Sequence, residues 1–362
     1  MKNTLGQSIS VTLFGESHGE AIGATLDGVP AGIKVDFDFI DHLLTLRRPV
    51  GSISTARREK DQYKIISGVY EGFTTGTPIC IIIPNEDTKS KDYDSIKDLA
   101  RPSHADFTAS VKYKGFEDKR GGGHFSGRLT APLVAAAGIL IPALNKKGIF
   151  IGTHLARCAG VSDREFDDLS EDINTLNSLT FAALDSEKAD LMQENIKKAA
   201  AEGDSVGGIL ETAVIGLPAG VGEPWFSTIE GVLANALFSV PAVKGVEFGG
   251  GFALADMKGS SANDSFDVKD GKIVTVTNNS GGINGGITNG MPIIFRCAVK
   301  PTPTISKPQQ TVNLKTNTVE TITATGRHDP CIAHRARVVV DAITALTLCD
   351  ILSLKFGADW LV

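Results

Sequence analysis

A serine and a histidine stand side by side in the glycine-bounded block Gly15-Glu16-Ser17-His18-Gly19. An imidazole donates or accepts a proton near neutral pH, which makes His18 a candidate general acid or base. Neighbouring residues of a strand point to opposite faces, so we expect no nucleophilic pair between Ser17 and His18 unless the turn bends sharply. The block has the letters of a GxSxG motif, but we expect it to be a turn between two strands, at 8–14 and 21–27, and not the strand-to-helix turn of a nucleophile elbow. These residues therefore favour proton transfer over serine hydrolase chemistry.

A second histidine lies in the block Arg101-Pro102-Ser103-His104-Ala105-Asp106. This block has a purely structural alternative, because Ser103 or Asp106 could cap the N-terminus of a helix. Five of the seven histidines fall in such polar loops, at positions 18, 104, 124, 328 and 334. Since neither HExxH nor the Cys/His spacing of a zinc site is present, we predict no metal site.

Three consecutive glycines form the centre of the block Arg120-Gly121-Gly122-Gly123-His124-Phe125-Ser126-Gly127-Arg128, which stands just before a predicted helix. Their backbone N–H groups can converge on an anion, and the N-terminus of the helix adds its dipole. The block is not a P-loop, because the Gly-Lys-Ser/Thr ending is missing, and it is not a GxGxxG fingerprint. It predicts a site for a phosphate or another polyanionic group.

Three further polar blocks lie in the second half of the chain: Asn278–Gly286, Lys300-Pro301-Thr302-Pro303-Thr304 and Arg327-His328-Asp329-Pro330-Cys331. Asp329 stands among arginine and histidine, so it should stay ionised and could act as a base. Each block taken alone could be a turn. Together they predict a cleft that binds a planar or phosphorylated ligand and a second anion.

Arginine is unevenly distributed along the chain. Ten of the 13 arginines stand at positions 47, 48, 57, 58, 101, 120, 128, 327, 335 and 337, and none lies between residues 165 and 295. Arginine captures phosphate and carboxylate groups through paired hydrogen bonds. Solvated surface charge is the alternative for any single arginine, but ten that share blocks with glycine and histidine favour an anionic ligand.

The composition is that of an ordinary globular chain. The 362 residues are 42% hydrophobic and 22% charged, which excludes a disordered protein. A net charge of −6 argues against a general nucleic-acid binder. No apolar run reaches the roughly 18 residues that span a bilayer, and the first residues lack an apolar signal core. From the charge and the apolar runs we expect neither nucleic-acid nor membrane partners. The five cysteines form no CxxC motif, so we expect reduced thiols in a cytoplasmic protein.

The chain contains an internal repeat, which predicts two similar halves at about 1–184 and 185–362 of a single domain. His18 corresponds to Val206 in the second copy, whereas Ser17 is kept as Ser205. The framework therefore does not need the imidazole, which favours a chemical role for His18. Generic glycine-rich turns are the alternative explanation. The matches, at shifts of 188, 214 and 207 residues, align Gly15–Gly32 with Gly203–Gly220, Gly72–Ile79 with Gly286–Ile293 and, more weakly, Arg120–Arg128 with Arg327–Arg335.

Hydrophobic periodicity and turn residues predict the elements that position these blocks. We expect strands at 8–14, 21–27, 63–69 and 77–84, and helices at 36–46, 129–147, 186–202 and 336–355. Pro142 should kink or end the second of these helices. Hairpins combined with a few helices, without βαβ alternation, favour an α+β fold over a doubly wound sheet.

Six blocks of the sequence resemble the chorismate synthase family: GESHGEAIGATLDGVPAG, GGGHFSGRLTA, RHDPCIAHRA, RPSHADFT, PAVKGVEFG and KPTPTI. The resemblance covers nearly the whole chain in the same order. It implies an α+β fold with helices sandwiched between antiparallel sheets, and a homotetramer. It also implies a lyase that eliminates phosphate from 5-O-(1-carboxyvinyl)-3-phosphoshikimate to form chorismate, the last step of the shikimate pathway. The family requires reduced FMN, although the net reaction is redox-neutral.

The resemblance also implies roles for individual residues. His18 would give a proton to the leaving phosphate, and His104 would stand beside the reduced flavin ring. Asp329, with Ser17 and Ser126, would relay a proton at the flavin N5. The substrate carboxylates and phosphate would be held by Arg47, Arg48 and Arg128. The implied FMN contacts are His124, Phe125, Ser126, Pro241, Ala242, Gly285, Lys300, Pro301, Thr302, Pro303, Thr304 and Arg327.

The chain departs from the common family pattern at Ile53 and His124, where many members have arginine, and at Asp341, where many have glutamate. Some members reduce their own flavin with NADPH, for which Arg47 is a candidate contact. Two other functions stay open at this point. One is a different flavin enzyme such as a reductase, although no Rossmann fingerprint is present. The other is a non-catalytic anion-binding protein.

Overall fold

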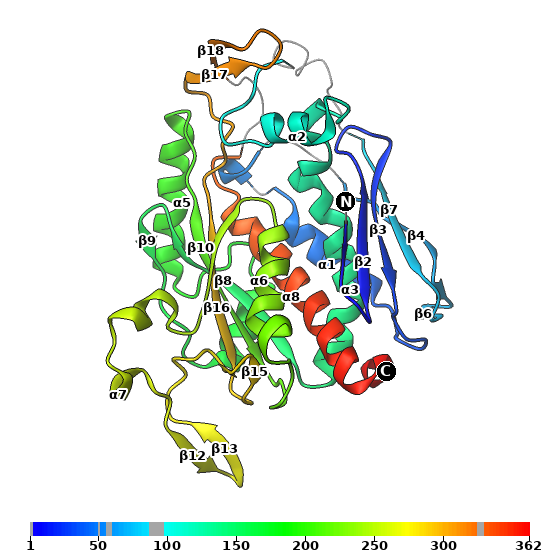
Figure 1. Ribbon diagram of the computed structural model, residues 1–362, viewed down its shortest axis with the longest axis vertical. Helices are drawn as coiled ribbons and strands as arrows, with labels where there is room; N and C mark the ends of the chain where they lie inside the picture. Colours follow the sequence, from blue (N-terminus) through cyan, green and yellow to red (C-terminus); the bar gives the residue numbers. More distant parts are fainter. Residues whose placement is uncertain (1–2, 50, 56–59, 87–97, 324–328) are drawn as a thin grey trace.

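The structure is a computed structural model of the chain, and it describes all residues except 1–2, 50, 56–59, 87–97 and 324–328. Its framework is two five-stranded antiparallel sheets with helices between them (Figure 1). The first sheet has the order β1 (Thr4–Leu5), β2 (Ser10–Gly15), β3 (Ala21–Asp27), β7 (Ile79–Pro84), β4 (Lys64–Ser67). The second has the order β11 (Val243–Phe248), β16 (Ile293–Val299), β10 (Gly208–Ile215), β8 (Phe150–Cys158), β9 (Val161–Ser162).

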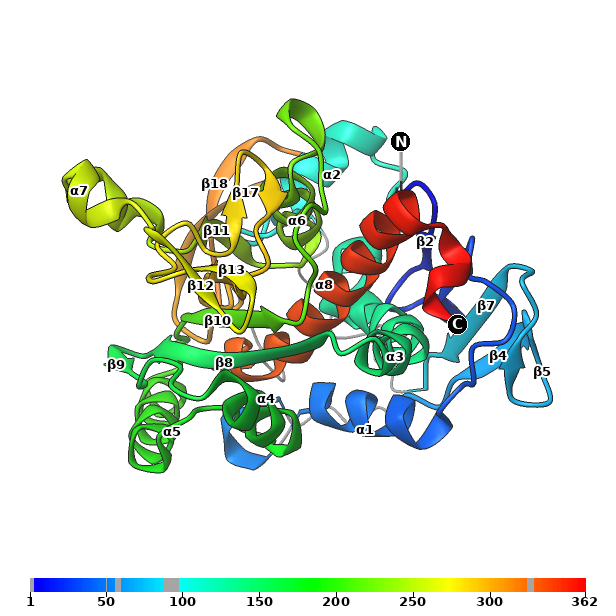
Figure 2. The ribbon, with the colours of Figure 1, turned by 90° about the horizontal axis from the view of Figure 1, so that it is seen from below.

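The layer between the sheets is built around α3 (Thr130–Lys146) and α8 (Ala333–Phe356). Figure 2 looks along α3 and shows α8 running obliquely beside it. The helix α3 packs on β3 and β7, whereas α8 packs on β8 and β10. The alternation in Ile79, Ile81 and Ile83 explains the contact, because these side chains share one face of β7 and are fully buried. This arrangement confirms the predicted α+β sandwich.

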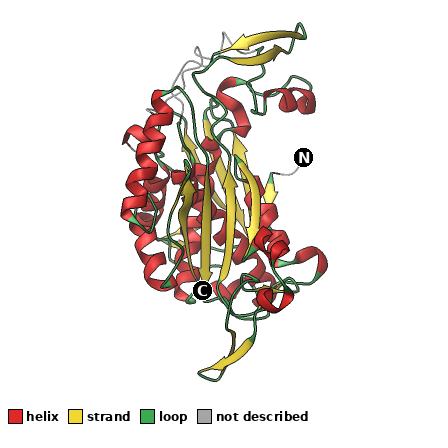
Figure 3. Ribbon diagram, turned by 90° about the vertical axis from the view of Figure 1, so that its left-hand side faces the viewer, coloured by secondary structure: helices red, strands yellow, loops and turns green. Residues whose placement is uncertain are grey.

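Two more helices border this layer. The helix α1 (Phe37–Arg47) packs against α3. The two helices are so close at Gly138 that a Cβ atom on this residue would lie 2.8 Å from Cγ1 of Ile40. The helix α6 (Ile229–Ser239) packs against α8 and β11. On the opposite face of the second sheet, α4 (Leu169–Ser178) covers β8, and the long strands of this sheet run side by side in Figure 3.

The remaining elements are short or peripheral. The helix α5 (Ser186–Ala201) lies beside β9. The other strands and helices are β5 (Val69–Tyr70), β6 (Phe73–Thr74), α2 (Asp106–Tyr113), α7 (Gly259–Ala262), β12 (Phe266–Lys269), β13 (Lys272–Thr275), β14 (Ile283–Asn284), β15 (Ile287–Thr288), β17 (Gln309–Asn313) and β18 (Thr318–Ile322).

The predicted helices are confirmed, with one correction. The helix α3 continues to Lys146, four residues beyond Pro142, so that proline does not end it. Pro142 stands close to the C-terminus of the helix, and the one backbone hydrogen bond that its missing N–H removes does not end the helix. The helical stretch Gly127–Lys146 is long and apolar enough to cross a bilayer, yet 78% of its apolar window is buried inside the protein. Its apolar composition is therefore explained by its position in the protein core.

The two sheets have matching strand pairings. Leu26 lies opposite Ile79 in the first sheet, and Val214 lies opposite Ile293 in the second. The sequence shifts of 188 and 214 residues relate these two pairs to each other. The order β2-β3-β7-β4 thus corresponds to β8-β10-β16-β11. An internal duplication would account for this correspondence, and it stays a prediction.

The Gly-x-Pro-Ala-Gly turns are also equivalent. The N–H of Gly32 donates to the carbonyl oxygen of Thr74, and the Thr74 hydroxyl donates to Pro30. In the second half, Gly220 donates to Thr288, and the Thr288 hydroxyl donates to Pro218.

The second sheet begins earlier than the predicted boundary near residue 184. The strand β8 (Phe150–Cys158) belongs to it, with Phe150 opposite Ile215 as Ser10 is opposite Asp27 in the first sheet. The helices α4 and α5 are inserted between β8 and β10, so a shift of 188 residues does not align the first strands. By strand topology, the halves meet between α3 and β8.

Candidate active site

A cleft of ≈ 1170 Å³ draws its lining from both halves of the chain. From the first half it takes the predicted residues His18, His104, His124, Phe125, Ser126, Arg47 and Arg128. From the second it takes Pro241, Ala242, Lys300, Thr302, Pro303, Thr304 and Asp329. Lys300 also joins the two halves directly, because its Nζ donates to the carbonyl oxygen of Ser103 at 2.6 Å.

The turn after β2 bends enough to bring Ser17 against His18. The Ser17 Oγ lies 3.1 Å from Nδ1 of His18, and Gly19 N–H donates back to the Glu16 carbonyl oxygen at 3.0 Å. The exception allowed for a sharp bend therefore applies, because the pair stands in a turn and not in an extended strand. Ser17 is fully buried and does not line the cleft, so it orients the imidazole and is not placed as a nucleophile.

The three glycines leave room for two imidazoles. All three have positive φ, at 63°, 104° and 53° for Gly121, Gly122 and Gly123. A Cβ atom on Gly121 would lie 2.0 Å from Cε1 of His18, and one on Gly122 would lie 3.3 Å from Cε1 of His104. Glycine at these positions therefore lets the backbone pass close to both histidines. The predicted anion cradle of N–H groups stays a prediction.

His104 is held by an ion pair. Its Nδ1 lies 3.0 Å from Oδ1 of Asp106, and Arg101 donates to both oxygens of that carboxylate. Burial opposes ionisation of Asp106, but hydrogen bonds from Arg101 and His104 outweigh it and hold its pKa well below the ordinary value. An ionised Asp106 favours a proton on Nδ1, which leaves Nε2 for the ligand.

The capping alternative for this block is wrong. The residue that caps α2 is Ala105, and it makes no side-chain capping bond. The Asp106 carboxylate binds Arg101 and His104 instead.

Two neighbouring residues complete the first-half wall of the cleft. The His124 Nδ1 donates to the carbonyl oxygen of Gly15 at 2.8 Å, which fixes the ring. The Ser126 Oγ accepts the N–H of Arg128, so it keeps its own proton to donate. The Phe125 ring is 39% exposed and offers an apolar surface beside them.

In the second half, Asp329 is fixed by two partners. Its Oδ1 accepts the N–H of Thr55 at 2.8 Å, and its Oδ2 pairs with Nη2 of Arg335. Thr302 Oγ1 is buried and has no hydrogen-bond partner among the described residues. A buried hydroxyl without a partner in a ligand-sized cleft fits a polar group of a bound ligand. Its neighbours Pro303 and Thr304 line the same wall.

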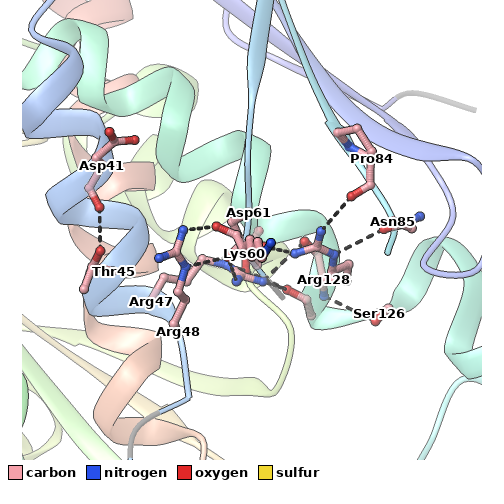
Figure 4. Close-up of polar contacts among 12 residues, drawn as sticks. Asp41, Thr45, Arg47, Arg48, Lys60, Asp61, Pro84, Asn85, Ser126 and Arg128 are labelled. Atoms are coloured by element: carbon pink, nitrogen blue, oxygen red, sulfur yellow. Dashed lines mark hydrogen bonds and ion pairs between the residues drawn. The ribbon is translucent and has the colours of Figure 1, made fainter. Parts of the chain in front are cut away.

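The predicted substrate arginines converge on a carboxylate that sequence reasoning missed (Figure 4). Asp61 Oδ2 accepts from Nη1 of Arg47 at 3.1 Å and lies 3.8 Å from Nε of Arg48, while Oδ1 pairs with Nη1 of Arg128. No local pattern singles out Asp61 in the sequence. The predicted NADPH contact at Arg47 stays a prediction; in the structure that guanidinium binds Thr130, Asp61 and the carbonyl oxygen of Gly127.

Some predicted residues are not in the cleft lining. Gly285 lies in the exposed turn between β14 and β15, with φ of 61°, and Pro301 is exposed. Arg48 and Ser17 adjoin lining residues without lining the cleft themselves. Arg327, like His328, Arg57 and Arg58, lies outside the described residues. Ile53, where many family members have arginine, is buried in the core, so this chain has an apolar side chain at that position.

Among the residues that the structure describes, no group of three or more histidine, cysteine, aspartate or glutamate side chains could hold a metal ion. The arrangement instead offers two oriented imidazoles, one fixed carboxylate and several arginines around one cleft. Such a set can deliver or remove protons and neutralise an anionic leaving group.

Comparisons with known proteins identify close similarities. A family model described as chorismate synthase matches residues 9–353. A chorismate synthase of Pyrococcus abyssi is 46% identical over 355 residues, covering 98% of each chain. A chorismate synthase of Dehalococcoides mccartyi is 44% identical over 362 residues, covering 99% of this chain and 98% of the relative. A solved structure titled "Crystal Structure of Chorismate Synthase" superposes with a TM-score of 0.76 at 30% identity, covering 97% of this chain and 94% of the other.

Proposed function

The chain belongs to the chorismate synthase family, and from this premise we propose that its cleft binds reduced FMN beside 5-O-(1-carboxyvinyl)-3-phosphoshikimate. The enzyme is a lyase that eliminates phosphate from this substrate to form chorismate, the last step of the shikimate pathway. The observation that carries the site proposal is the convergence of His18 and His104 on one cleft with Asp329.

The residues present fit a flavin nucleotide. The orphaned hydroxyl of Thr302 and the proton of Ser126 can donate to polar atoms of the cofactor, and Phe125 can cover an aromatic ring. When bound, reduced FMN supplies the electronic step of the elimination that no side chain can provide. The residues that would hold it are His124, Phe125, Ser126, Pro241, Ala242, Lys300, Thr302, Pro303 and Thr304.

His18 supplies the proton that phosphate needs as it leaves. Breaking the carbon–oxygen bond places negative charge on the departing oxygen, and protonation by an imidazole neutralises it. Ser17, buried behind the ring, acts through His18 by holding Nδ1. With Nδ1 bound to Asp106, His104 would present Nε2 to the cofactor.

Asp329 is the carboxylate placed to accept a proton in the cleft. Thr55 and Arg335 hold it in position. Arg47 and Arg128 provide positive charge for the substrate carboxylates and phosphate.

The direct test is phosphate release from 5-O-(1-carboxyvinyl)-3-phosphoshikimate under anaerobic conditions with dithionite-reduced FMN. We expect stoichiometric phosphate and chorismate with reduced FMN, and none with oxidised FMN. Flavin reduction by NADPH without phosphate release would indicate a reductase instead. Binding of the substrate without turnover would indicate an anion-binding protein.

We also propose a homotetramer. Exposed apolar side chains gather on the hairpin β12–β13 and beside the cleft, where Phe226 is 98% exposed. Such surfaces are typical of subunit contacts. The hairpin contributes Phe266, Val268 and Ile273. Light scattering after size-exclusion chromatography measures the mass, and a monomer would contradict the proposal. A cytoplasmic location is consistent with five cysteines and no CxxC motif.

A further inference from the structure

Asp61 occupies the centre of the arginine cluster. Its side chain is fully buried, and its two oxygens each face a different guanidinium, Oδ2 toward Arg47 and Oδ1 toward Arg128. All three residues line the cleft, and Figure 4 shows the contacts among them. The carboxylate therefore stands where an anionic group of a ligand would have to bind these two arginines.

The cluster carries more positive than negative charge. Three guanidiniums, of Arg47, Arg48 and Arg128, surround the single carboxylate, which leaves an excess of two positive charges (three minus one). Burial, together with the neighbouring arginines, lowers the pKa of Arg47 to about 10 against the opposing effect of Asp61. The excess charge is thus not neutralised by Asp61 alone, and it favours an additional or stronger anion.

The arginines have other anchors, whereas Asp61 has none that the structure describes. Arg47 also donates to Thr130 Oγ1 at 3.0 Å, and Arg128 also donates to Asn85 Oδ1 at 3.2 Å. Within the described part of the chain, the Asp61 carboxylate makes hydrogen bonds only to the arginines. Both guanidiniums can therefore keep their positions when the carboxylate leaves.

The backbone of Asp61 is strained in this position. Its φ is 51°, in the left-handed region that side-chain-bearing residues adopt at a cost, although aspartate tolerates it better than most. Because rotation about χ1 leaves φ unchanged, the carboxylate can swing away from the arginines while the backbone keeps this conformation.

We propose that Asp61 is the resident counter-ion of the substrate's anionic subsite: it pairs with Arg47 and Arg128 until a carboxylate or phosphate of the substrate displaces it. The identity of that substrate rests on the proposed function. Binding of an anion and binding of Asp61 are mutually exclusive at these two guanidiniums. Asp61 thereby keeps the arginines ordered in the free enzyme and sets the affinity of the subsite.

The test compares Asp61→Asn with the unaltered protein by calorimetric titration with inorganic phosphate. Asparagine keeps the shape but removes the competing charge, so we expect phosphate to bind about tenfold tighter. The variant should unfold at a lower temperature without phosphate, because two buried guanidiniums lose their partner, and phosphate should restore most of the difference. Asp172→Asn is the matched control, since Asp172 pairs with Arg164 outside the cleft and should leave phosphate affinity unchanged.

If Asp61→Asn binds phosphate with equal or weaker affinity, the proposal is overturned. That result is expected if Asp61 only stabilises the fold, or if it stays bound to the arginines together with the anion. If the variant does not fold, a crystal structure of the unaltered protein in saturating phosphate decides. Phosphate between Arg47 and Arg128 with Asp61 moved away supports the proposal, and Asp61 still bonded to both contradicts it. Neither measurement needs turnover, so their failure is distinct from a failure of the phosphate-release assay.

Discussion

Gly121 lies against His18 so closely that a Cβ atom at position 121 would come within 2.0 Å of Cε1 and 2.2 Å of Nδ1 of the imidazole. No side chain fits there without moving His18. We predict that Gly121→Ala lowers kcat by roughly 10²–10⁴-fold, because a displaced proton donor loses its catalytic contribution. Stopped assays of phosphate release measure the change.

The control for this prediction is Gly115→Ala. Gly115 also has positive φ, at 81°, but a Cβ atom there would meet nothing within 4 Å. It reports the cost of backbone strain without a clash, so it should lose stability but little activity. Equal loss of activity in both variants would show that strain, and not the His18 contact, is responsible.

Replacement of either histidine should separate chemistry from folding. We predict that His18→Ala and His104→Ala each lose roughly 10²–10⁴-fold in rate while the protein keeps its fold. The second half of the chain has Val206 where the first has His18, so the framework does not require the imidazole. Thermal unfolding is measured beside the rates, and a melting temperature reduced as strongly as the rate would favour a structural role.

Asp106 should matter through the tautomer of His104. We predict that Asp106→Asn lowers kcat by roughly 10²-fold, because an amide can donate to Nδ1 and favour the wrong tautomer. The pH–rate profile should change shape while KM changes less than kcat. Asp204→Asn removes a carboxylate that pairs with Lys307 at 2.7 Å elsewhere, and it is the matched control. An unchanged pH profile in Asp106→Asn would contradict the assignment.

The buried carboxylate of Asp341 predicts a pH dependence of stability. Burial raises its pKa to about 6 from 3.8, against the opposing effects of Arg337 and Thr153. The folded state thus binds the proton more tightly than the unfolded state, and stability falls as the pH rises from about 4 through 6. Asp341→Asn mimics the protonated form, so it should abolish this decline and exceed the unaltered protein in stability above pH 6.

Urea unfolding at pH 5 and pH 7.5 tests this prediction (roughly one unit below and more than one unit above the pKa). Asp350→Asn serves as the contrasting control. Asp350 accepts the backbone N–H groups of Gln7, Ser8 and Ile9, so this variant should be less stable than the unaltered protein at both pH values. A less stable Asp341→Asn at the higher pH would mean that Arg337 needs the charged carboxylate.

Flavin and substrate should bind cooperatively. Residues for both ligands line one cleft, and substrate charge neutralised by the arginines should favour the closed arrangement around the flavin. We predict that FMN binds weakly to the free protein and about 5–150-fold tighter with substrate present, the usual range for coupled sites. Fluorescence titration of FMN with and without substrate measures the coupling. Equal affinities would remove it.

Much of this fold was predictable because its signals are local. The strand expected at 77–84 and the helix expected at 129–147 depend only on neighbours in the chain, and both are confirmed as β7 and α3. The repeated Gly-x-Pro-Ala-Gly turn predicted the equivalence of β3 with β10, since the same glycine and proline restraints act in both copies. The boundary between the halves was not predictable in this way, because β8 shares no such turn.

The blocks of the sequence determined which chemical groups the site contains, and the resemblance to a family determined the reaction they serve. Only the tertiary structure decided how the groups pair. The contact of Ser17 with His18 depends on the bend of a turn, and Asp61 enters the cluster because the fold brings it between Arg47 at the end of α1 and Arg128 just before α3. Contacts across 14 or 67 residues, as in Asp61 with Arg47 and Arg128, leave no periodicity in the sequence. They arise from long-range packing, which no local pattern encodes.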